Sequence, residues 1–179
     1  MALQLGHRVS VDLDLFSDIS FDEGELSGYL ISEYNLELDF IAKCTIKGEI
    51  EGVQIDCIAH RYPWLALPRE ECDIRLADLS DIAAMKLNAI AGNGTRVKDF
   101  IDVAYLSTRL SLNEMLNAYE RKYKVNLLIP IKALTYFEDI NFEEPIKMTG
   151  KACFNWKKIV KRLNEMQRSP DKKFVGLPV

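Results

Sequence analysis

The chain has few of the residues that build common metal and disulfide sites. Two histidines, His7 and His60, occur among its 179 residues, too few for a histidine-rich metal site. The four cysteines have no C-x-x-C spacing, so we expect reduced thiols in a cytoplasmic protein rather than zinc ligands or disulfides: Cys44, Cys57, Cys72 and Cys153. No run of eighteen apolar residues is present, and the N-terminus lacks the layout of a secretory signal, so no membrane partner is expected.

Basic residues are scarce in the first two thirds of the chain. Residues 1–120 contain 10 Lys+Arg against 21 Asp+Glu, whereas residues 121–179 contain 13 against 6. The basic C-terminal region fits either contact with RNA phosphates or an acidic partner, or an ordinary solvated helix surface. With 48% apolar and 28% charged residues, the chain has the composition of an ordinary globular protein. Its 179 residues can bury one substantial core, or a core plus a small helical appendage.

Two acidic residues two positions apart stand in the apolar segment 10–17, SVDLDLFS. Because alternate residues of a strand share a face, we expect Asp12 and Asp14 to point one way and their apolar neighbours to face the core: Val11, Leu13 and Leu15. Two adjacent anions favour a bound cation, and oxygen ligands of this kind suit Mg²⁺. The alternative is an exposed strand face with two solvated charges.

A second apolar segment, residues 52–59, carries a single acid, Asp56. A carboxylate in a buried strand is costly unless it is paired or bound to metal. We therefore predict that Asp12, Asp14 and Asp56 form a cradle for divalent ions on two adjacent strands, as phosphoryl or nucleotidyl transfer requires. A metal-dependent phosphohydrolase is also compatible with this pattern.

Lys86 interrupts the apolar stripe of a helix predicted over residues 79–91. Such a lysine either extends to water or reaches an anion, which is a carboxylate of the site or a nucleotide phosphate. In the next predicted helix, 97–110, Asp99 and Asp102 are three residues apart and share a face. Acids near the start of a helix also favour its dipole, which is the alternative explanation for this pair.

Strands are predicted early in the chain and helices late. The periodicity predicts strands over 9–16, 36–47, 53–60 and 74–76, and helices over 2–8, 22–34, 79–91, 97–110, 112–123, 127–137 and 156–167. Ser80 is the candidate N-cap of the helix at 79–91. This layout predicts an α+β protein with an α/β core over residues 1–78 and a mainly helical region over residues 79–179.

Three blocks of residues, in this order, resemble the AbiEii/AbiGii-type nucleotidyltransferase toxins of the DNA polymerase β-like superfamily. They are residues 3–17 (LQLGHRVSVDLDLFS), 81–91 (DIAAMKLNAIA) and 98–102 (KDFID), and the resemblance covers about residues 2–140. It implies a polymerase β-like mixed sheet with flanking helices, followed by a helical C-terminal segment. It also implies a bacterial toxin of a toxin–antitoxin or phage-defence pair.

The resemblance implies metal-binding and catalytic roles for the early residues. Asp12 and Asp14 match the family's metal-binding D-x-D, and Arg8 matches the basic residue before it, with a role in binding the nucleotide. Asp56 falls where the superfamily's third strand carboxylate is expected. These three carboxylates would hold Mg²⁺ and take part in catalysis.

The later blocks imply nucleotide contacts. Lys86 matches the helix lysine that contacts the nucleotide phosphates and assists catalysis. Asp99 and Asp102 match the K-D-x-x-D block, in which we assign Asp99 to nucleotide binding and Asp102 to catalysis, as the more important of the two.

The resemblance implies Mg²⁺-dependent transfer of a nucleotide from a nucleoside triphosphate to an RNA such as tRNA, or to a protein, with a cognate antitoxin as a further partner. The family's Gly-Gly-Thr or Gly-Ser turn, which cradles the triphosphate, would lie before Met1. We therefore expect weakened triphosphate binding by the chain as given. The alternative function is a catalytically impaired homologue that acts as a protein-interaction module.

Overall fold

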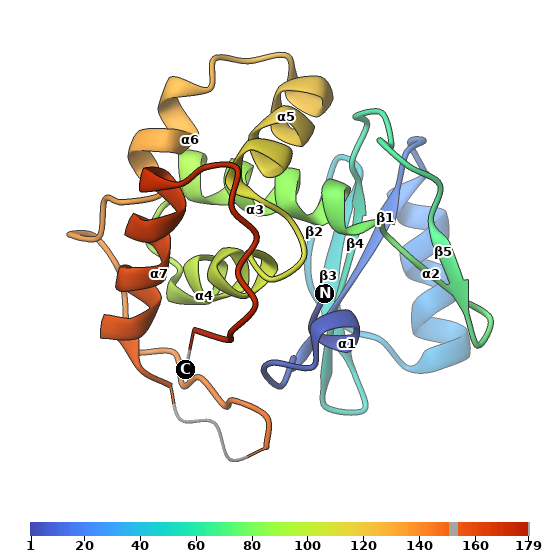
Figure 1. The fold of residues 1–179 in the computed structure, drawn as a ribbon. Helices are drawn as coiled ribbons and strands as arrows, with labels where there is room; N and C mark the ends of the chain where they lie inside the picture. The colour runs from blue at the N-terminus through green and yellow to red at the C-terminus, as the bar shows by residue number, and fades with distance from the viewer. Residues whose placement is uncertain (151–153, 179) are drawn as a thin grey trace. The chain divides into compact units, whose positions relative to one another are not determined.

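The computed structural model describes residues 1–150 and 154–178 and has the predicted mixed α+β architecture (Figure 1). It contains two compact units. One unit is Ser10–Pro63, and the other combines Met1–Val9 with Trp64–Val179. We call them the sheet unit and the helical unit. In the described part of the chain, no helix is both long and apolar enough to cross a membrane.

The sheet unit consists of four strands and one helix. The strands are β1 (Asp12–Ser17), β2 (Glu37–Ala42), β3 (Thr45–Ile50) and β4 (Val53–Ala59), and the helix is α2 (Glu23–Tyr34). Their order in the sheet is β1-β4-β3-β2, with β1 parallel to β4 and the other neighbours antiparallel. A small core lies between the sheet and α2: Leu36, Ile46, Ile55 and Cys57, with Phe21, Leu26 and Leu30 packed against them.

Two sequence-based predictions for this unit were wrong. The single strand predicted over 36–47 is divided into β2 and β3 by a turn at Cys44, whose φ is 55° and whose backbone N–H donates to the Glu23 carboxylate. Leu13 and Leu15 were expected in the core, but they are 44% and 45% exposed, and Val11 is 67% exposed. The reason is that β1 is an edge strand, whereas α2 packs against β2 and β3.

Gly48 gives the first testable prediction. It lies in the middle of β3, where an added Cβ would meet the backbone carbonyl oxygen of Glu37 and come within 2.9 Å of Leu36 Cδ1. Because the obstructing carbonyl belongs to the neighbouring strand, Gly48→Ala should lower the free energy of unfolding by about 1–3 kcal/mol. Urea unfolding followed by far-UV circular dichroism measures this loss. Gly28→Ala is the control, since an added Cβ there meets nothing within 4 Å, and equal stability of the two variants would contradict the prediction.

The helical unit contains the larger core. Its elements are α1 (Ala2–Leu5), β5 (Arg69–Glu71), β6 (Ile74–Leu76), α3 (Leu79–Gly92), α4 (Val97–Leu106), α5 (Leu112–Tyr123), α6 (Leu128–Ala133) and α7 (Trp156–Arg168). All ten residues of α4 are buried, and this helix packs against α3 and α7 (Figure 1). A helix buried on every side must pair any charge that it carries, and α4 carries Lys98, Asp99 and Asp102.

Every helix predicted for this unit has a counterpart in the structure, and most of them have changed ends. The N-cap of α3 is Asp78 rather than Ser80, because the Asp78 carboxylate accepts from both the backbone N–H and the hydroxyl of Ser80. α4 ends at Leu106 instead of residue 110, and α6 covers only the first half of the helix predicted at 127–137. Pro130 lies in the first turn of α6, where it breaks no helical hydrogen bond.

The first residues of the chain belong to the helical unit. After α1, whose C-cap is Gly6, Arg8 forms an isolated β-bridge with Met148, and the backbone N–H of Val9 donates to the Lys147 carbonyl at 2.9 Å. Residues 64–78 also belong to the helical unit. The limits of the two units therefore differ from the domain boundary that the sequence predicts after residue 78.

Candidate functional site

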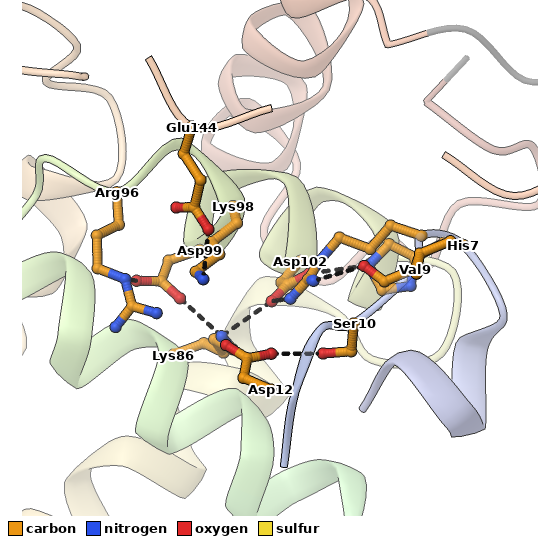
Figure 2. A network of polar contacts seen from close by, with 11 residues as sticks. His7, Val9, Ser10, Asp12, Lys86, Arg96, Lys98, Asp99, Asp102 and Glu144 are labelled. Atoms are coloured by element: carbon orange, nitrogen blue, oxygen red, sulfur yellow. Dashed lines mark hydrogen bonds and ion pairs between the residues drawn. The ribbon is translucent and has the colours of Figure 1, made fainter. Parts of the chain in front are cut away.

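One face of the sheet carries the acids that the sequence singles out. In the strand register, Asp14 of β1 lies opposite Asp56 of β4, and Asp56 lies opposite Lys47 of β3. Directly opposed residues of neighbouring strands point to the same face, and Asp12 shares that face with Asp14. Asp12 Oδ1 accepts a hydrogen bond of 2.7 Å from the Ser10 hydroxyl (Figure 2).

Asp56 is already paired in this row. Lys47 donates to its carboxylate and forms an ion pair in which the lysine side chain is 42% exposed and the aspartate 21%. Among residues 1–150 and 154–178, no group of three or more His, Cys, Asp or Glu side chains is placed to hold a metal ion. Mg²⁺ commonly takes only one or two carboxylates and completes its shell with water and phosphate oxygens. The Asp12 and Asp14 pair fits that requirement, whereas a cradle of three carboxylates stays a prediction.

The helical unit contains a second charged group, which we call the polar cluster: His7, Arg8, Lys86, Asp99 and Asp102 (Figure 2). It assembles residues from three segments, namely the turn after α1, the middle of α3 and the first two turns of α4. Four of its five members are residues that the sequence singled out. The structure therefore brings together blocks that are more than ninety residues apart in the chain.

Asp102 lies at the centre of the polar cluster and is fully buried. Arg8 contacts both of its carboxylate oxygens, at 2.8 Å through Nε and 2.9 Å through Nη2, and Lys86 Nζ lies 2.9 Å from Oδ2. Burial alone would raise the pKa of Asp102, but the hydrogen bonds from His7 and Arg8, with the charges of Lys86 and Arg8, hold it well below the usual carboxyl range. Asp102 is therefore an anion at any physiological pH.

Lys86 interrupts the apolar stripe of α3 and, of the two alternatives considered from the sequence, it reaches an anion. Its ammonium donates to Asp99 Oδ1 at 2.6 Å and also contacts Asp102. Burial works to lower the pKa of Lys86, but the two carboxylates outweigh burial and raise it, so the side chain stays protonated. Arg96 Nε lies 3.8 Å from the other oxygen of Asp99.

His7 was missed by the sequence reasoning, which counted histidines only as metal ligands. Its Nε2 lies 2.8 Å from Asp102 Oδ1, and its ring lies 4.7 Å from that of Tyr105. Because Asp102 is ionised, we assign the proton to Nε2. Within the described residues, the buried Nδ1 has no hydrogen-bond partner. The sequence feature that could have pointed to His7 is its position directly before Arg8, in the first of the three blocks that resemble the toxin family.

A comparison with known protein families identifies the family of this chain. The family model described as nucleotidyl transferase AbiEii toxin, of type IV toxin–antitoxin systems, matches residues 28–171. The chain belongs to this family. No curated protein and no solved structure matches the chain.

The matched range includes part of the candidate site. Asp56, Lys86, Asp99 and Asp102 lie inside it, whereas residues 8–14, with Arg8 and the D-x-D pair, precede it. Three of the five residues of the polar cluster therefore lie within the range that the family model matches. Within the helical unit, Arg8 is tied to the polar cluster by its contacts with Asp102.

Proposed function

We propose that this AbiEii family member is a Mg²⁺-dependent nucleotidyltransferase that moves a nucleotide from a nucleoside triphosphate to a hydroxyl group of an RNA, such as a tRNA, or of a protein. The observation that carries the proposal is the polar cluster, in which Arg8 and Lys86 converge on the buried carboxylate of Asp102. Two cations fixed in this way suit the negative charge that develops on a leaving pyrophosphate.

Each group of residues has a chemical task in this reaction. Asp12 and Asp14 would hold Mg²⁺, which when bound lowers the pKa of the acceptor hydroxyl and neutralises phosphate charge. Lys86 and Arg8 would bind phosphate oxygens. Asp102 orients both cations and stays ionised while it does so. Asp99 holds the Lys86 ammonium from the other side, which fixes its direction.

A second candidate is a protein-interaction module that binds an antitoxin. It is favoured by the internal pairing of the polar cluster, because Lys86 already donates to Asp99 and contacts Asp102 in this structure. Catalysis would require phosphate oxygens to compete with these carboxylates. Binding of labelled nucleoside triphosphate to the protein separates the two candidates.

Asp14→Asn tests the proposed function. Loss of one of two adjacent metal-binding carboxylates should reduce transfer of label from nucleoside triphosphates to bulk RNA or protein by at least about a hundredfold. Asp39→Asn, on β2, is the control and should keep normal transfer. Transfer at the wild-type rate by Asp14→Asn would refute the metal role. A wild-type chain that binds no triphosphate in the presence of Mg²⁺ would favour the interaction module.

A further inference from the structure

Lys47 is unusual in its surroundings. The four strands of the sheet unit contain six acidic residues and one basic residue, which is Lys47. The unit as a whole, residues 10–63, has 12 Asp+Glu against 3 Lys+Arg. A lone cation on an acidic sheet has several carboxylates available to it, so its choice of partner is informative.

The partner of Lys47 is Asp56, the residue expected to be the third metal-binding carboxylate. The strand register places the two directly opposite each other on β3 and β4, and it places Asp14 opposite Asp56 on the other side. Asp14, Asp56 and Lys47 therefore form one row across three strands. The Lys47 ammonium pairs with the Asp56 carboxylate, which a second divalent ion would need as a ligand.

We infer that Lys47 is a built-in cation that engages Asp56 and limits the divalent-ion site of this unit to Asp12 and Asp14. This inference rests on the proposed function, because it assumes that the D-x-D pair binds metal. It adds a residue that neither the D-x-D pattern nor the family match assigns. It also changes the role of Asp56, which pairs with a lysine instead of coordinating an ion.

The arrangement has a consequence for how the metal is bound. Two carboxylates leave most of the octahedral shell of Mg²⁺ to water or to oxygens of another molecule. The positive charge of Lys47 further lowers the affinity of the same sheet face for a bare divalent cation. The ion is then held weakly until phosphate oxygens of a triphosphate complete its shell, so metal and nucleotide should bind cooperatively.

The test uses Mn²⁺ as the probe and the full chain, with binding measured by calorimetry and by the electron paramagnetic resonance signal of free Mn²⁺. Lys47→Met should bind Mn²⁺ about tenfold more tightly than the wild type, because Asp56 becomes free to join the site. Lys43→Met is the matched control. It removes the same charge from the exposed turn between β2 and β3 and should change the affinity by less than about threefold.

The double variant Lys47→Met/Asp56→Asn shows whether the gain depends on Asp56. It should return to within about threefold of the wild-type affinity. A gain that persists in the double variant, or a Lys47→Met affinity equal to that of Lys43→Met, would overturn the inference. Loss of Mn²⁺ binding in Asp14→Asn tests the metal site itself, so failure of the proposed function is distinguishable from failure of the role of Lys47. Unchanged circular dichroism confirms that each variant is folded.

Discussion

Asp102→Asn should lower the free energy of unfolding by about 3–5 kcal/mol, because the substitution leaves the mostly buried cations Arg8 and Lys86 without the counter-charge that they share. The asparagine amide also presents a donor where the carboxylate accepted four contacts. Urea unfolding measures the loss. Tryptophan fluorescence is a suitable probe because both tryptophans, Trp64 and Trp156, belong to the helical unit.

The same substitution should change how stability depends on pH. The pKa of Asp102 is lowered in the folded chain, so its contribution is complete above the ordinary carboxyl range near 4 and is lost as the pH falls below that range. The wild type should therefore lose more stability than Asp102→Asn between about pH 5 and pH 3. Glu165→Gln, which removes one member of an exposed ion pair with Lys161, is the control and should cost less than about 1 kcal/mol. Parallel pH profiles for wild type and Asp102→Asn would contradict this account.

Lys122→Met should be about as destabilising, at about 3–5 kcal/mol, although it lies outside the polar cluster. Lys122 Nζ contacts Asp81 Oδ1 at 2.6 Å, and both side chains are fully buried. The Asp81 carboxylate also accepts from the backbone N–H groups of Leu65 and Ala66. Methionine fills the space of the lysine stem but leaves the Asp81 charge without its cation.

A second substitution separates the lost charge from lost packing. In Lys122→Met/Asp81→Asn neither position of this buried ion pair carries a charge, so the double variant should be more stable than Lys122→Met alone. The same urea titration provides the comparison. If the losses in the free energy of unfolding from the two substitutions simply add, the broken ion pair is not the reason that Lys122→Met is destabilising. The contact of Lys122 Nζ with the Trp64 ring at 4.8 Å then becomes the better explanation.

The helices were predictable where the apolar period was long and a cap was present. The helix expected at 112–123 has the same bounds in the structure, where the Ser111 and Glu114 side chains form a capping box. The strands were less predictable because their ends depend on turns. The sequence around Cys44 contains no glycine or proline to mark the turn between β2 and β3, and a hydrogen bond to distant Glu23 helps to fix it.

The candidate site was predictable in its residue types but not in its pairings. The blocks around Lys86 and Asp102 indicated charged residues on apolar helices, and the structure shows them in contact. Periodicity alone gives no information on which anion a lysine reaches, because that depends on how α3 and α4 pack. For the same reason the pairing of Lys47 with Asp56 needed the strand register, which places residues from β3 and β4 opposite each other.

The order of segments along the chain affects how this protein folds during synthesis. The sheet unit is an insertion between residue 9 and residue 64 of the helical unit. His7 and Arg8 leave the ribosome long before Asp102, so the buried salt bridges of the helical unit close a chain loop of more than ninety residues. The inserted sheet unit has only short-range strand pairs apart from β1 with β4, and it is complete before that closure. Nascent chains arrested before residue 102 should therefore protect the inserted sheet from protease while the N-terminal nine residues remain cleavable.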